Sequence, residues 1–299
     1  MAKIVTPTTG YINNGGLVQL GSDNNSDQWD YLSFSKASNP WRISVEGDLP
    51  TNSTDQNMTV SFFEGTIPLF SAYGTWGVQG QSSQGATKKN WKLKLKNPGT
   101  GNKLKIKIGD WFPMSSVTLK AYADDRTLIR DSLTTEIWRN FHKAPTGFLA
   151  PEAAYKYFDG DDFGVHTSAL FSTAGFPCEL WHNGEFMGLY VLRSDNSEDD
   201  YLMDTNNPQH ILIQPQHASN FWTSGNYNPG EWEYTSPAAT DDTTTQACQR
   251  IIKWFSDCLS KTVSVRDTYF QYVDLTSVFD YIFICEISAS FDSMENNFM

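Results

Sequence analysis

Two hydrophobic periodicities occur along this chain, and their distribution limits the folds that it can adopt. Short runs of β-branched and aromatic residues alternate with loops rich in Asn, Asp and Gly through residues 1–119, which predicts antiparallel strands. The spacing of an amphipathic helix appears in residues 124–141 and returns in residues 245–260 and 274–291. This arrangement predicts an α+β fold, an antiparallel β-sheet with flanking helices.

The clearest local prediction is a β-hairpin in residues 176–194. The segments FPCELWH and FMGLYVLRS flank the letters NGE. Asn183 and Gly184 tolerate the positive φ of a tight two-residue turn, so they predict where the two strands reverse.

A lysine-rich segment, GQSSQGATKKNWKLKLK, occupies residues 80–96. On a strand, the apolar residues of NWKLKLK face one way while Lys92 and Lys94 face the other. The preceding turn contains Ser82 and Ser83, and the backbone N–H groups of such a turn can approach a phosphate. The segment therefore predicts a phosphate-binding site. The alternative is an edge strand whose lysines oppose aggregation.

Charged residues also occur on the helix predicted for residues 124–141. Asp125, Arg130 and Glu136 can orient a phosphate-binding lysine, as an acidic helix residue does in kinases. A solvated charged face is the alternative. The segment DGDDFG of residues 159–164 contains the letters of the kinase magnesium motif in the wrong chain order, so we interpret it as an acidic turn, with calcium binding as the alternative.

The last ten residues, SFDSMENNFM, contain an acid and an amide five positions apart, Asp292 and Asn297. A protein-kinase catalytic loop uses this spacing for the base that accepts the hydroxyl proton and the amide that holds magnesium. A pattern of only two fixed residues occurs often by chance, so the significance of this motif depends on the motifs that precede it.

Composition argues against several classes of function. The formal net charge of −12 and the pI near 4.8 oppose nucleic-acid binding. Charged residues make up 19%, so much of the surface is neutral and suits packing against other proteins. We expect no membrane span and no signal peptide, because no apolar run has the required length. The four cysteines lack C-x-x-C spacing and are expected to be reduced and mostly buried.

Taken in order, four motifs resemble those of the CotH kinase family, atypical kinases named after a spore-coat protein. The family's GxSS turn and KKxY/WKLKL-like strand are similar to GQSSQGATKKNWKLKL, and its YADxxLLRxxL helix to YADDRTLIRDSL. Its VxxNGEYxGLYxL hairpin and D…NNFY segment are similar to ELWHNGEFMGLYVL and DSMENNFM. The resemblance implies an atypical kinase-like core in residues 71–299. Residues 1–70 are expected to be a β-rich segment that anchors the chain to other proteins.

The resemblance also implies transfer of the γ-phosphoryl group of ATP to Ser or Thr side chains, with Mg²⁺ as a cofactor. The implied phosphate-binding residues are Lys92, Lys94, Ser82 and Ser83. Asp292 would accept the hydroxyl proton or hold a metal ion, and Asn297 would hold magnesium.

Two departures from the family pattern affect this reading. Arg193 is followed by acids and amides, where a phosphate would be repelled. The metal-binding aspartates of the family, in a WDxD-like strand, would come after Met299. We therefore expect a domain that is C-terminally incomplete, with an incomplete metal side.

Three functions remain open at this stage. The low charge, the abundant Asn, Thr and Gly, and the opening MAKIVTPTTGY resemble phage virion proteins. The first expectation is therefore a structural or host-adsorption component of a virion, assembled in the host cytoplasm as a homo-oligomer with other virion proteins. The second is an active kinase acting on coat or virion proteins. The third is a module that binds cell-surface glycans through the aromatic residues of NFWTSGNYNPGEWEY, residues 220–234.

Overall fold

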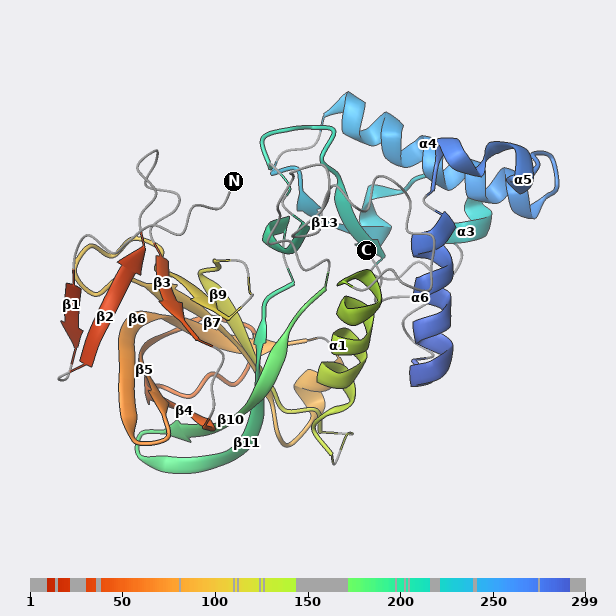
Figure 1. Ribbon diagram of the computed structural model, residues 1–299. Helices are drawn as coiled ribbons and strands as arrows, with labels where there is room; N and C mark the ends of the chain where they lie inside the picture. Colours follow the sequence, from red (N-terminus) through yellow and green to blue (C-terminus); the bar gives the residue numbers. More distant parts are fainter. Residues whose placement is uncertain are drawn as a thin grey trace. The chain divides into compact units, whose positions relative to one another are not determined.

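The computed structural model divides the chain into two compact units (Figure 1). Unit 1 contains Met1–Glu136 and Asp159–Asn196, and unit 2 contains Ile137–Phe158 and Ser197–Met299. The structure describes residues 10–13, 16–21, 31–35, 39–80, 82–109, 111, 113–123, 125, 127–143, 172–196, 198–201, 203, 205–215, 221–238, 241–273 and 275–290.

A closed β-barrel is the main element of unit 1 (Figure 1). Within the described residues, its strands follow one another in the order β10-β11-β9-β7-β6-β5-β4. Their bounds are Trp41–Gly47 (β4), Gln56–Glu64 (β5), Ile67–Gln79 (β6), Asn90–Lys96 (β7), Ser116–Lys120 (β9), Gly175–His182 (β10) and Glu185–Ser194 (β11). Neighbours are antiparallel except β10 and β4, which pair in parallel and close the barrel.

Alternation along the strands directs the apolar side chains into the barrel. Trp91, Leu93 and Leu95 of β7 are at most 2% exposed, as the sequence pattern predicted. The rings of Phe62 and Phe70, on the neighbouring strands β5 and β6, stack with their centroids 4.3 Å apart. The core of unit 1 therefore fills the barrel, and the polar residues of the same strands are left on its outer face.

The predicted hairpin is present and takes part in closing the barrel. Asn183 and Gly184 connect β10 to β11 with φ values of 48° and 83°. The N–H of Asn183 donates to the carbonyl oxygen of Val45 at 2.9 Å. Its side-chain Oδ1 accepts from the N–H of Gly47 at 3.1 Å. The turn thus fixes the end of β10 against the end of β4.

The predicted fold class is confirmed in part. The chain combines helices and strands and β-structure dominates unit 1, but the sheet closes on itself and contains one parallel pair. Closure removes the sheet edges that would otherwise expose unpaired N–H and C=O groups. Periodicity along one strand reports which face is buried, so it could not reveal which distant strand would be its neighbour.

A second sheet of unit 1 has the strand order β1-β2-β3-β8. Its strands are Gly10–Asn13 (β1), Gly16–Gly21 (β2), Tyr31–Phe34 (β3) and Lys105–Ile108 (β8). Strands β3 and β8 pair in parallel. Ile106 and Ile108 of β8 belong to the same buried cluster as the barrel core. The short turn η1 (Ser82–Gly85) precedes β7.

The predicted helices are confirmed. Helix α1 (Arg130–Lys143) begins in unit 1, and the division between the units falls within it. The elements of unit 2 are η2 (Glu198–Tyr201), β12 (Leu212–Pro215), α3 (Phe221–Ser224), η3 (Pro229–Glu231), β13 (Trp232–Ser236), α4 (Asp242–Leu259), α5 (Val265–Thr268), η4 (Tyr269–Gln271) and α6 (Leu275–Ser288). Asp241 caps α4 by accepting from the N–H of Thr244 at 2.9 Å.

Three further expectations concern the whole chain. Among the described helices, none is long and apolar enough to cross a membrane. All four cysteines are free thiols, and three of them are buried, which confirms the expectation drawn from their spacing. The boundary expected near residue 70 stays a prediction, as does the anchoring role of residues 1–70.

Candidate functional site

Strand β7 places the predicted phosphate-binding lysines on the outer face of the barrel. Because alternate residues of a strand point to opposite faces, Lys92 and Lys94 share the face opposite Trp91 and Leu93. The Lys92 ammonium lies 2.6 Å from Oδ2 of Asp195, which follows the end of β11. The Asp195 side chain is only 8% exposed. The structure therefore gives Lys92 a buried acidic partner that the sequence analysis did not assign.

Lys94 has a separate partner, in a more open place. Its ammonium lies 2.7 Å from Oδ2 of Asp55, and the side chains of Lys94 and Asp55 are 52% and 36% exposed. The hydroxyl of Thr75, on the adjacent strand β6, donates to the same carboxylate at 3.2 Å. The two lysines of this strand thus have different acids and different exposure.

The residues around Lys92 come from neighbouring strands at matching positions. In the strand register, Lys92 pairs with Thr118 of β9, and Thr118 pairs with Arg193 of β11. Paired residues of adjacent strands project from the same face of a sheet, so these three side chains lie next to one another on the outer face of the barrel. The Thr118 hydroxyl donates to the carbonyl oxygen of Arg193 at 3.4 Å. These pairings connect β7, through β9, to the end of the predicted hairpin.

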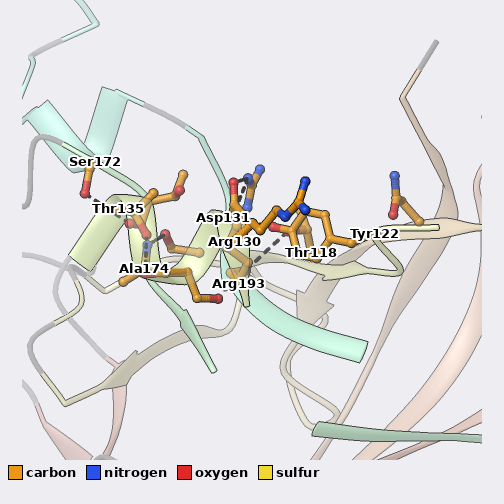
Figure 2. A network of polar contacts seen from close by, with 12 residues as sticks. Thr118, Tyr122, Arg130, Asp131, Thr135, Ser172, Ala174 and Arg193 are labelled. Atoms are coloured by element: carbon orange, nitrogen blue, oxygen red, sulfur yellow. Dashed lines mark hydrogen bonds and ion pairs between the residues drawn. The ribbon is translucent and has the colours of Figure 1, made fainter. Parts of the chain in front are cut away.

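Helix α1 contributes a carboxylate next to Arg193. Asp131, in its first turn, lies 3.4 Å through Oδ1 from Nη1 of Arg193, and Figure 2 shows the two side chains facing each other. The hydroxyl of Tyr122 donates to Oδ2 of Asp131. Burial alone would lower the pKa of Arg193, but the charge of Asp131, together with Tyr122 and Asp195, raises it. Burial raises the pKa of Tyr122, so its hydroxyl stays protonated and remains a donor.

Lys120, at the end of β9, is the third cation of the group. It lies two residues beyond Thr118 and pairs in register with Val191 of β11. No carboxylate of the described residues lies within ion-pair distance of its ammonium. Burial, followed by the positive charge of Arg193, lowers the pKa of Lys120 to about 7, although the acids nearby act in the opposite direction. A lysine that is partly neutral at physiological pH is typical of functional sites.

The loop between β9 and α1 has an unusual backbone. Tyr122 and Leu128 have φ values of 42° and 58°, a region that side-chain-bearing residues rarely adopt. Such strain is concentrated at functional sites. Asp125 holds the loop together by accepting from the N–H groups of Thr127 and Arg130, each at 3.0 Å. Asp125 thus stabilises the start of α1, and the carboxylate that faces Arg193 is that of Asp131.

Two lysines before β7 fix the turn η1. Lys89 donates to the carbonyl oxygen of Ala86 at 3.0 Å and also to that of Gln84. Lys88 lies over the ring of Tyr190, with its ammonium 4.3 Å from the ring centroid. These lysines therefore have partners within the fold, Lys89 in the turn itself and Lys88 on β11. Ser82 and Ser83 begin the turn, but their side chains lie outside the described part of the chain.

The structure brings together only some of the residues predicted from the sequence. Lys92 is in the cationic group, whereas Lys94 is beside it with its own acid, and Glu136 is an exposed residue of α1. Asp292 and Asn297 lie outside the described residues, and their roles stay predictions. The same holds for the acidic segment of residues 159–164.

The residues of the site that the sequence analysis missed are Thr118, Lys120, Tyr122, Asp131 and Asp195. The alternation of SVTLK could have revealed two of them, because Thr118 and Lys120 fall on the polar face of that strand. Arg193 was noted only as a residue followed by acids. Those acids were expected to repel a phosphate, and one of them, Asp195, is the partner of Lys92.

The arrangement can hold an anionic group. We name as the cationic row the residues Lys92, Lys120 and Arg193, which face the carboxylates Asp131 and Asp195. Nε of Arg193 is buried without a hydrogen-bond partner among the described residues, so one donor of the row is still unsatisfied. In the described part of the chain, no three His, Cys, Asp or Glu side chains gather as a metal site.

Two of the aromatic residues proposed to bind glycans have a structural role in unit 2, whereas the side chain of Trp222 lies outside the described part of the chain. Tyr227 and Trp232 are 9% and 8% exposed and pack with Cys248 and Ile252 in the core of that unit. They are therefore not available as an exposed platform for a sugar ring.

A comparison with protein families identifies the matched region. The family model described as CotH kinase protein matches residues 77–299. This range contains every residue of the cationic row and both carboxylates that face it. A search of curated proteins finds no significant match to the chain.

Proposed function

Since the chain belongs to the CotH kinase family, we propose that the cationic row binds the phosphates of ATP and that the domain transfers the γ-phosphoryl group to a protein hydroxyl. The observation that carries this proposal is the grouping of Lys92, Lys120 and Arg193 on one face of the barrel. Three cations face two carboxylates there, so the five groups have a net charge of +1 when all are ionised.

The residues of the cationic row have donors suited to the phosphates of a nucleoside triphosphate. A lysine ammonium has three donors, and the contact of Lys92 with Asp195 leaves two for phosphate oxygens. Ion pairs with Asp131 and Asp195 hold the two cations in place before the ligand arrives, which reduces the entropy lost on binding.

In the proposed transfer, the bond between the γ-phosphorus and the oxygen that bridges it to the β-phosphate breaks. A bond forms between the γ-phosphorus and a Ser or Thr hydroxyl oxygen, and Asp292 accepts the hydroxyl proton. Mg²⁺, when bound, would neutralise charge on the phosphates, and Asn297 is the residue expected to hold it. The row contributes by positioning the phosphates and stabilising their charge.

The test compares Lys92→Met with Lys96→Met, a matched variant on the same strand and face. Four residues of strand place Lys96 about 13 Å from Lys92. We expect the wild-type chain and the Lys96 variant to bind Mg-ATP and to transfer labelled phosphate to a protein acceptor. The Lys92 variant should bind at least about tenfold more weakly, the loss expected for one charged hydrogen bond. Equal binding of Mg-ATP by both variants would show that the cationic row does not contact the phosphates.

A second function is favoured by the ion pairs themselves. Both lysines that the family resemblance assigns to phosphates have carboxylate partners within 2.7 Å, which neutralise them. The low fraction of charged residues also suits a protein surrounded by other proteins. The second proposal is therefore a structural or host-adsorption component of a phage virion with an inactive kinase site. A melting temperature that millimolar Mg-ATP leaves unchanged, together with self-association in analytical ultracentrifugation, would favour it over the kinase.

A further inference from the structure

The cations of the row differ in their partners. Asp195 lies 2.6 Å from Lys92, and Asp131 lies 3.4 Å from Arg193. Both carboxylates are thereby used. Lys120 is the cation left over, with no acid of the described residues within ion-pair distance.

Lys120 also lies where a ligand of the row would reach it. It is two positions from Thr118 on β9, and Thr118 pairs with Lys92 on one side and Arg193 on the other. Two residues of strand correspond to about 7 Å, so one phosphate group or two linked groups can bridge Lys120 and its neighbours. The contact requires no ion pair to break. Separating Lys92 from Asp195 would leave a nearly buried carboxylate unpaired, which is strongly unfavourable.

We propose that Lys120 is a further phosphate-contacting residue of this site and that it takes up a proton when the phosphate binds. This inference rests on the proposed nucleotide-binding function and adds a residue and a pH dependence to it. The proton comes from solvent and converts the amine of Lys120 to an ammonium ion. The bound phosphate supplies the negative charge that Lys120 lacks in the free protein.

The charged groups around Lys120 set the direction of the effect. Burial lowers its pKa to about 7, Arg193 and Lys92 act in the same direction, and Asp131 and Asp195 act against them. An added anion raises the pKa again because it favours the charged form. Affinity for phosphate should therefore be highest below pH 7 and fall as the pH rises above it. A phosphate group with a second pKa near 6 is fully ionised at pH 8.5, so proton uptake measured there belongs to the protein.

The first experiment measures ATP binding by calorimetry at pH 8.5, in two buffers with different ionisation enthalpies. The wild-type chain and Lys96→Met should take up nearly one proton for each ATP bound. Lys120→Met should take up none and bind about tenfold more weakly. Lys120→Arg keeps a charge that does not titrate, so it should bind at wild-type strength or better without proton uptake. Unchanged proton uptake in both Lys120 variants would overturn the inference while leaving nucleotide binding intact.

The second experiment observes Lys120 directly and needs no nucleotide. Lysines are dimethylated with ¹³C-formaldehyde, the Lys120 signal is assigned from its absence in Lys120→Arg, and its titration is followed by NMR. We expect a midpoint near pH 7 in the free protein and a rise of about 2.5 pH units with pyrophosphate, the size of shift that an uptake of nearly one proton at pH 8.5 requires. A midpoint near 10 without ligand, or one that pyrophosphate does not move, refutes the inference. A pyrophosphate shift without ATP binding would reject the proposed kinase function alone.

Discussion

Two lysines of strand β7, two residues apart on the same face, have different surroundings. Lys94 and Asp55 form an ion pair in which both side chains are more than a third exposed. Lys92 pairs with a nearly buried Asp195, beside Arg193 and Lys120. The alternation of the strand is the same at both positions. The difference comes from neighbours on β9, β11 and α1, so the fold, and not the lysine motif, decides which lysine can belong to a binding site.

The largest expected effect tests the acid that α1 contributes. Asp131→Ala leaves the guanidinium of Arg193 without its carboxylate and the hydroxyl of Tyr122 without its acceptor. We expect the free energy of unfolding to fall by roughly 2–4 kcal/mol, because a largely buried charge is left unpaired. Asp55→Ala removes an exposed acid and should cost less than about 1 kcal/mol. Urea denaturation measures both, and equal losses would contradict the contrast between the two places.

An intermediate effect is expected for Lys120→Met, and it should depend on pH. The pKa of Lys120 is lower in the folded protein than its ordinary 10.5, so between pH 7 and 10.5 the unfolded chain binds more protons. Stability then rises with pH over this window, and the penalty for burying the ammonium is fully present below pH 7. The variant should be more stable than wild type at pH 6, and this difference should narrow by at least roughly 1 kcal/mol as the pH rises to 10. A difference that is constant from pH 6 to 10, as expected for the control Lys96→Met, would show that Lys120 is ordinarily charged.

The smallest effect is expected at the exposed pair. Lys94→Met should change the free energy of unfolding by less than about 1 kcal/mol, because both partners are hydrated. Raising the salt concentration should reduce even this difference, since exposed charges are screened. Thermal melts at low and high ionic strength measure it. A loss as large as that of Asp131→Ala would mean that the two places are energetically alike.

Local features of the fold could be predicted from the sequence. The strand of residues 90–96, the turn at Asn183 and Gly184 and the helix that contains Arg130 depend on contacts between near neighbours. Barrel closure could not, because β10 meets β4 across more than a hundred residues. Side-chain periodicity carries no information on such long-range pairing.

The residues of the candidate site likewise fall into those that the sequence predicts and those that only the fold reveals. Lys92 was predicted because its motif and its strand alternation are local. Asp195, Asp131 and Lys120 were missed because their role depends on which residues the barrel places next to Lys92. Neighbouring acids were expected to repel phosphate. In the fold one of the acids after Arg193, Asp195, is paired with Lys92, which only the three-dimensional arrangement reveals. Asp292 and Asn297, the predicted catalytic and metal residues, remain predictions.

The parallel pairing of β10 with β4 has a consequence for when the candidate site can form during synthesis. Strand β4 (Trp41–Gly47) must wait for β10 (Gly175–His182) before the barrel can close. Contacts so distant in sequence make folding slow, because a long loop must close before they form. Lys92 also leaves the ribosome about a hundred residues before Asp195, its partner. A nascent chain therefore has the lysine motif but no assembled site, and binding of phosphate should begin only once the strand that leads to Asp195 has been made and has docked.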